Sequence, residues 1–73
     1  MTIKTIVGEN VRGYRKKKGW TQEKLGYNAK INSEHLSRLE NGLENTTIET
    51  LQKLASTLKI DTWLLLKPES YKT

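Results

Sequence analysis

The sequence predicts a compact, all-α domain of five short helices. Apolar residues recur every three or four positions along most of the chain, which is the spacing of one face of a helix. No segment shows a convincing alternation of apolar and polar residues, which is the pattern typical of a strand. Residues that cap helix N-termini precede several apolar segments, and glycine or proline follows several of them. A chain of 73 residues has the size of one domain.

Capping and terminating residues in the sequence mark where the first two helices begin and end. A first helix is expected over residues 5–18, and Gly19 is expected to end it. A second helix should follow Thr21, whose hydroxyl can accept a hydrogen bond from a free backbone N–H group. Trp20 and Leu25 stand at the two positions of a hydrophobic staple around this cap. The apolar residues of the first helix are Ile3, Val7, Val11 and Tyr14.

The third and fourth helices carry the same kinds of signal. Asn32 should cap the third helix, and Asn41 with Gly42 should end it. The fourth helix should begin at Thr46, which has the spacing of a capping box with a later glutamate, or at Thr47, which fits the apolar pattern better. Its expected apolar stripe consists of Ile48, Leu51, Leu54, Ala55 and Leu58.

A fifth, short helix is expected near the C-terminus. Asp61 should cap it, and Ile60 should pack on Leu65 as a hydrophobic staple. Pro68 should stop it, because proline cannot continue a helix.

Positive charge is concentrated in the first part of the chain. The net charge is +5, with eight Lys and Arg against two acidic residues up to Lys30 and five against six afterwards. A basic half suggests a polyanionic partner, although a surface that only keeps the protein in solution is an equal alternative. The run Lys16-Lys17-Lys18 is expected to be solvated and to add long-range attraction.

The composition argues against several classes of protein. Cysteine is absent, so no disulfide or thiolate metal site is expected, and one histidine is too little for a metal centre. The longest apolar run has four residues, and the N-terminus does not look like a signal peptide, so a cytoplasmic protein without membrane segments is expected. No phosphate-binding glycine loop or convergent carboxylate pair is visible, so we expect no enzyme and no cofactor.

Two segments carry a resemblance to a known family. The first is Thr21-Gln22-Glu23-Lys24-Leu25, and the second is Leu36-Ser37-Arg38-Leu39-Glu40-Asn41-Gly42. Together they resemble the helix-turn-helix motif of the Cro and phage-repressor (XRE) family of DNA-binding transcriptional regulators. The similarity continues through Ile48-Glu49-Thr50-Leu51 and covers about residues 7–66. The chain departs from the family pattern at Lys30 and Lys59, where glycine is usual, and at Gly26, where alanine is usual.

The resemblance implies a lambda-repressor-like DNA-binding domain over residues 6–67, with its motif at about 22–41 and a tail at 68–73. A recognition helix at about 32–41 would enter the major groove. The implied base contacts are Ser33, Glu34, Ser37 and Arg38, which a helical wheel also places away from the core. The implied DNA-backbone contacts are Thr21, Gln22, Asn32 and Asn41. The family also implies a structural ion pair between Arg15 and Glu40.

Some of these residues have alternative roles. Arg38 could read guanine or could contact a phosphate. Glu34 is more simply an ion-pair partner of Arg38 one turn away on the helix, and Asn41 also serves as a helix terminator. His35 is expected to be a boundary residue packed near the second helix.

The C-terminal helix offers a surface for a homodimer. Trp63, Leu64, Leu65 and Leu66 are consecutive on a helix, so they point in several directions. The core should take Leu65, which leaves Trp63, Leu64 and Leu66 for an interface between two copies. Such a dimer would read a palindromic operator in double-stranded DNA. The alternative is that all four pack inside, beneath the tail with Tyr71.

These observations predict a sequence-specific transcriptional regulator, most simply an autoregulated repressor or a protein similar to restriction–modification controllers. An antitoxin that binds a toxin protein through the same fold is the alternative. A neighbouring toxin gene would favour that alternative.

Overall fold

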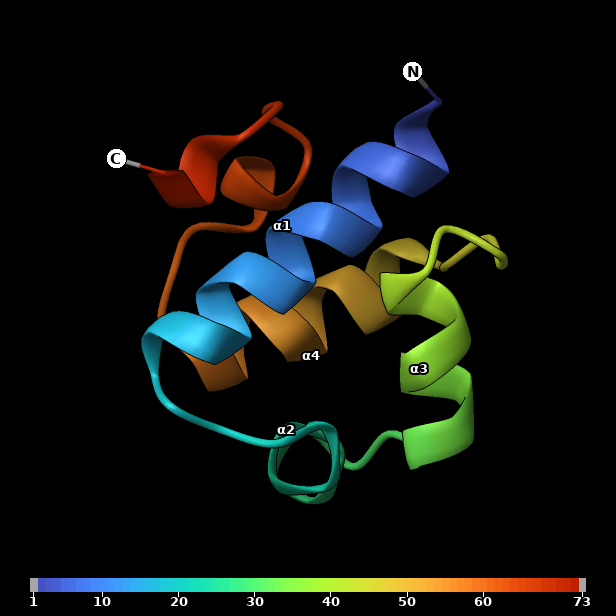
Figure 1. Ribbon diagram of the computed structural model, residues 1–73, viewed down its shortest axis with the longest axis vertical. Coiled ribbons are helices and arrows are strands. Elements are labelled where there is room, and N and C mark those ends of the chain that lie inside the picture. The colour runs from blue at the N-terminus through green and yellow to red at the C-terminus, as the bar shows by residue number, and fades with distance from the viewer. Residues whose placement is uncertain (1, 73) are drawn as a thin grey trace.

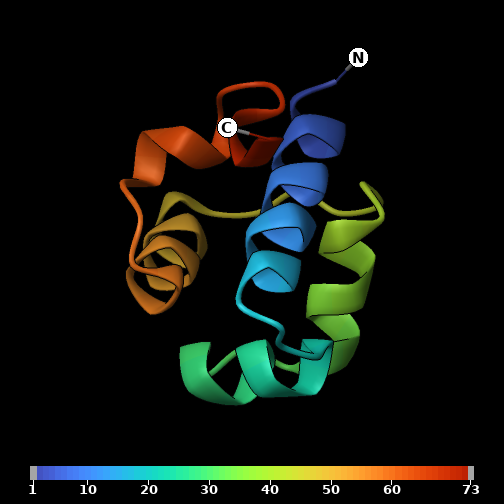
Figure 2. The same cartoon turned by 60° about the vertical axis from the view of Figure 1, so that its left-hand side comes forward.

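The computed structural model describes residues 2–72, which fold into four α-helices and two short 3-10 helices. The α-helices are α1 (Ile3–Lys17), α2 (Gln22–Ala29), α3 (Ser33–Glu40) and α4 (Ile48–Leu58). The 3-10 helices are η1 (Thr62–Leu65) and η2 (Ser70–Lys72). Residues 2–72 contain no strand, so the predicted all-α class is confirmed. α1 lies between α3 and α4, with α2 across one end of the three (Figure 1, Figure 2).

A side-chain cap begins each α-helix. The predicted caps Thr21 and Asn32 are confirmed, and Thr47 rather than Thr46 caps α4. The first helix begins two residues earlier than predicted, because the Thr2 hydroxyl accepts a hydrogen bond from a backbone N–H of the first turn.

The fifth helix differs from the prediction. It is a single 3-10 turn, Thr62–Leu65, and the Asp61 side chain makes no capping hydrogen bond. Only a few residues separate Asp61 from Pro68, which is too short a segment for a regular α-helix. After the proline, Glu69 adopts a left-handed conformation and a second 3-10 turn follows, which sequence patterns did not predict.

The core is formed by one apolar face from every α-helix and by η1. Leu65 is fully buried, as predicted. Ile48, by contrast, is 81% exposed, because it is the first residue of α4 and points away from the stripe that follows it. The buried apolar residues are Val7, Val11, Leu25, Ala29, Leu36, Leu39, Leu51, Leu54, Ala55, Leu58 and Leu65.

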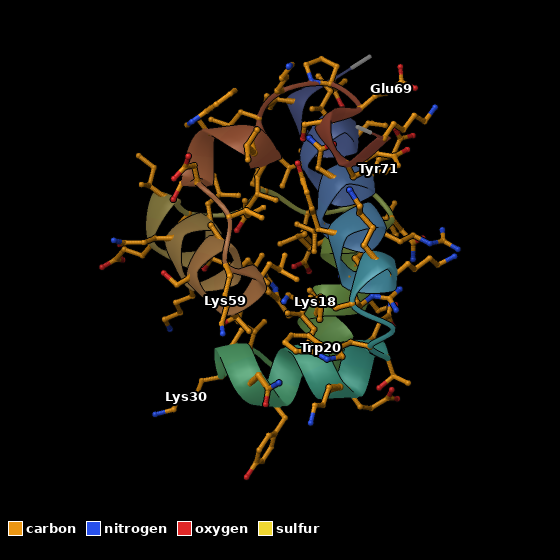
Figure 3. The ribbon with its side chains drawn as sticks, turned by 90° about the vertical axis from the view of Figure 1, so that its left-hand side faces the viewer. Lys18, Trp20, Lys30, Lys59, Glu69 and Tyr71 are labelled. Atoms are coloured by element: carbon orange, nitrogen blue, oxygen red, sulfur yellow. The ribbon has the colours of Figure 1, made fainter. Side chains whose placement is uncertain are left out.

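The expected tail packs on α1. The buried Asn10 amide donates hydrogen bonds to the backbone carbonyls of Leu65 (2.9 Å) and Lys67 (2.8 Å). The Tyr14 hydroxyl donates to Ser70 Oγ at 3.0 Å, and the ring of Tyr71 lies against α1 (Figure 3). Residues 68–72 thus form part of the packed domain, and Thr73 lies outside the described residues. At this exposed end, a hydrogen bond from Lys72 to Glu69 and the charge of that carboxylate raise the Lys72 pKa.

Lysine occupies two left-handed helix ends. Lys30 ends α2 with φ 59°, and Lys59 ends α4 with φ 60° (Figure 3). These are the two positions at which the family pattern has glycine, so the turn geometry is retained without the residue that favours it. A non-glycine residue in this conformation costs on the order of 1 kcal/mol.

Replacing either lysine with glycine should therefore stabilise the domain. We expect Lys30→Gly and Lys59→Gly each to raise the free energy of unfolding by about 0.5 kcal/mol, after subtraction of the greater freedom of glycine in the unfolded chain. Urea titration followed by circular dichroism measures the change. As a control, Lys53→Gly within α4 should lower stability by about 1 kcal/mol. Equal losses for all three variants would contradict the prediction.

Candidate nucleic-acid interface

α2 and α3 are joined by a three-residue turn that fixes their relative placement. Ile31 donates its backbone N–H to the Gly26 carbonyl at 2.8 Å, so the turn folds back on α2. A Cβ atom at Gly26 would lie 2.7 Å from the Ile31 carbonyl oxygen, so the turn needs the absence of a side chain there. With Lys30 in a left-handed conformation, the chain changes direction within this turn, and α2 lies across the end of α3 (Figure 1).

α3 presents a polar face to solvent. Leu36 and Leu39 face the core, as the helical wheel predicted. Of the four residues expected to contact bases, Ser33, Glu34 and Arg38 are exposed and Ser37 is half-buried. Of the four expected backbone contacts, Thr21, Asn32 and Asn41 are exposed and Gln22 is half-buried.

A buried ion pair ties α1 to the end of α3. Arg15 donates from Nε to Glu40 Oε2 at 2.8 Å and from Nη2 to Glu40 Oε1 at 2.9 Å. Arg15 also donates from Nη1 to the Trp20 carbonyl at 2.8 Å, which holds the chain just before α2. The structure thus contains the ion pair that the family resemblance implied. The pair is bidentate, with two N–H···O hydrogen bonds, and this geometry resists rotation of either side chain.

Gln22 joins this ion pair. Its amide donates from Nε2 to Glu40 Oε1 at 3.0 Å, so Glu40 receives hydrogen bonds from both α1 and α2. The sequence indicated Gln22 only as a DNA-backbone contact. No local pattern signals its contact with Glu40, because the contact depends on how α2 crosses α3.

Glu44, in the loop after α3, is the partner of two side chains on α3. It accepts a hydrogen bond from Arg38 Nε, and its other oxygen lies 2.6 Å from His35 Nδ1. Arg38 is therefore paired with Glu44 of the loop rather than with Glu34, which stands one turn before it on α3. His35 is half-buried, as expected of a boundary residue, and its Nδ1 faces this loop.

The lysines of the run Lys16-Lys17-Lys18, at the end of α1, are exposed. Lys17 lies over the Tyr14 ring at 5.6 Å from its centroid, and Lys18 lies over the Trp20 ring at 5.2 Å (Figure 3). Both lysines are exposed, at the end of α1 that leads into α2. Within residues 2–72, no cluster of three metal-ligating side chains occurs, and no helix is long and apolar enough to cross a membrane.

Comparison with known proteins agrees with this arrangement. The sequence profile of the helix-turn-helix family matches residues 11–62. The chain is 35% identical over 68 residues to the uncharacterized HTH-type transcriptional regulator y4dJ of Sinorhizobium fredii, covering 93% of this chain and 88% of y4dJ.

Two solved structures have the same fold. The restriction-modification controller protein C.AhdI from Aeromonas hydrophila superposes with a TM-score of 0.82 and 27% identity, over 85% of this chain and 94% of C.AhdI. The N-terminal DNA-binding domain of SinR from Bacillus subtilis superposes with a TM-score of 0.83 and 29% identity, over 89% of this chain and 96% of that domain. Against the longer full SinR regulator, the match spans only 56% of its length. By its sequence profile, its relatives and its fold, the chain belongs to the helix-turn-helix family of DNA-binding transcriptional regulators, in the Cro and phage-repressor (XRE) group.

Proposed function

We propose that this regulator binds double-stranded DNA sequence-specifically, with α3 in the major groove, and represses transcription, including that of its own gene. The observation that carries the proposal is the polar face that α3 presents to solvent. The end of α3 is fixed to α1 by the Arg15–Glu40 pair and to α2 by the Gln22 hydrogen bond to Glu40. Base contacts come from Ser33, Glu34, Ser37 and Arg38, the polar side chains on that face. The likeness to C.AhdI supports a controller-like role.

Backbone contacts come from residues at the ends of α2 and α3. Thr21 and Asn32 cap the two helices, so the free N–H groups of both first turns lie beside them for phosphate oxygens. Gln22 and Asn41 complete the set, Gln22 with the donor hydrogen that Glu40 does not use. These contacts fix the position of α3 on the duplex but carry no sequence information.

Two copies bind a palindromic operator as a homodimer. The interface is formed by Trp63, Leu64 and Leu66, which surround the buried Leu65. Trp63 is 58% exposed and Leu66 is 41% exposed, so this short turn presents apolar side chains to solvent. A two-fold axis here would present two α3 helices to half-sites spaced by about 34 Å or a multiple of it.

DNA binding by this chain should fall steeply with salt. Lysine and arginine side chains that neutralise phosphates release counterions, and about six such contacts would reduce affinity about 10³-fold between 50 and 200 mM salt. A duplex selected from a random pool, titrated by mobility shift at the two salt concentrations, measures the effect. A scrambled duplex of the same length should bind more weakly at both concentrations. Salt-independent binding, or equal binding to both duplexes, would overturn the proposed function.

A further inference from the structure

We propose that Glu44 is a positioning residue for base recognition: its carboxylate holds Arg38 by Nε and leaves the two terminal nitrogens for a base. The inference rests on the proposed DNA-binding function. It concerns a loop residue for which the sequence suggested no role.

The loop after α3 brings Glu44 back onto the helix. Gly42 adopts φ +72°, and Leu43 donates its backbone N–H to the Arg38 carbonyl at 2.9 Å, so the chain turns back at once. The Glu44 side chain is only 26% exposed, against 55% for that of Arg38. The carboxylate is thus the more buried of the two groups, and Arg38 is the more exposed side chain.

His35 fixes the carboxylate from the other side. It stands one turn before Arg38 on α3, and its Nδ1 lies 2.6 Å from the second oxygen of Glu44. The contact therefore puts a ring nitrogen of α3 beside this oxygen, at ion-pair distance. Each oxygen of Glu44 thus faces a nitrogen of α3, Arg38 Nε on one side and His35 Nδ1 on the other, and these two contacts restrain the carboxylate from turning.

The contact with Glu44 leaves the two terminal nitrogens of Arg38 available to a base. A guanidinium has five N–H donors in a rigid plane, and Glu44 takes the one on Nε. The terminal nitrogens are the pair that matches O6 and N7 of guanine. The hold on Nε restricts the rotation of a side chain that DNA binding would otherwise have to immobilise.

The charge of Glu44 acts in the same direction. A carboxylate beside the DNA-facing side of α3 repels phosphates, so it weakens binding to every sequence about equally. It also competes with phosphates for Arg38, which would otherwise be drawn to the nearest one. Glu44 therefore lowers general affinity and raises preference for the correct base pair.

The first test uses the free protein. In Glu44→Ala, the Nε–H of Arg38 should become more mobile, which ¹⁵N relaxation of the arginine side chains measures. Glu44→Gln keeps an acceptor oxygen at the same place and should keep part of the restraint. Glu49→Ala removes the same charge from an exposed position on α4 and should leave Arg38 unchanged. Equal mobility of Arg38 in the wild type and Glu44→Ala would overturn the proposed hold.

The second test measures recognition. Arg38→Ala first identifies the base pair whose preference depends on Arg38, by comparing the selected duplex with single base-pair changes. Glu44→Ala should reduce preference for that pair about 2- to 12-fold, the cost of immobilising one long side chain. It should also raise affinity for scrambled DNA about twofold, as removal of a charge about 10 Å away in water predicts.

A control variant distinguishes the contact between Glu44 and Arg38 from the simple loss of one negative charge. Glu49→Ala should keep the full preference at the Arg38 base pair, since it removes a charge without touching Arg38. Unchanged preference in Glu44→Ala would overturn the inference while the wild type still selects its duplex, which leaves the proposed function standing. A wild type that selects no sequence would overturn the proposed function, and the relaxation of Arg38 would still decide whether Glu44 holds it.

Discussion

Replacing Arg15 with methionine should lower the free energy of unfolding by about 3–5 kcal/mol, because it leaves the Glu40 carboxylate buried without its main partner. A domain of this size has a total stability of only about 4–11 kcal/mol. The variant should therefore lose a large part of the stability of the domain. Guanidinium titration followed by tryptophan fluorescence and circular dichroism measures the loss.

The double variant distinguishes a buried charge from lost packing. Glu40→Leu alone should lower the free energy of unfolding about as much as Arg15→Met, because it leaves the buried Arg15 guanidinium without its partner. Arg15→Met with Glu40→Leu removes both charges and should recover most of the loss. The recovery is incomplete, since the Trp20 carbonyl and the Gln22 amide each lose a partner.

An exposed arginine on the same helix provides the control. Arg12→Met should change stability by less than about 0.5 kcal/mol, because Arg12 is exposed on α1. If the losses of the two single variants simply added in the double variant, the two charges would not be coupled. That result would contradict the role of the pair as the link between α1 and α3.

The parts of the fold that could be predicted from sequence depend on neighbours along the chain. Thr21 and Asn32 cap their helices through N–H groups two or three residues away, so their chemistry is visible locally. Leu65 is buried because the apolar spacing around it leaves one inward position in a short turn. The Arg15–Glu40 pair spans 25 residues and could be expected only from the family resemblance.

The parts that could not be predicted depend on how distant segments meet. Asn10 holds carbonyls more than 50 residues away, and a single asparagine within a helix pattern carries no sign of such a contact. Glu44 captures Arg38 and His35 because the loop turns back at Gly42, which the spacing of Glu34 and Arg38 does not reveal. The sequence therefore predicted which face of α3 points away from the core, whereas the pairings among its side chains required the tertiary structure.

The proposed dimer would cover exposed apolar side chains near the C-terminus. Ile3 is exposed and lines the same small hollow of about 100 Å³ as Leu66, so an apolar residue of α1 adjoins the C-terminal surface. Ile3 and Leu66 thus place apolar area from both ends of the chain beside one another, and Trp63 on η1 is also exposed. Tryptophan is frequent among the residues that contribute most to protein interfaces. A second copy of the chain that covers them would remove that area from water.

Trp63→Ala with Leu66→Ala should convert the dimer to a monomer and reduce operator affinity about 10²- to 10⁴-fold, because each recognition helix would then bind its half-site alone. Sedimentation equilibrium at micromolar concentration measures the mass, and mobility shift on the selected duplex measures the affinity. The exposed residue Ile48, at the start of α4, provides the control, and Ile48→Ala should leave both unchanged. Because Trp63 and Leu66 are exposed in the single chain, the double variant should keep its helical content, so the lost affinity would reflect lost pairing. A wild-type monomer, with full operator affinity in the double variant, would show that the two half-sites are bound without this surface.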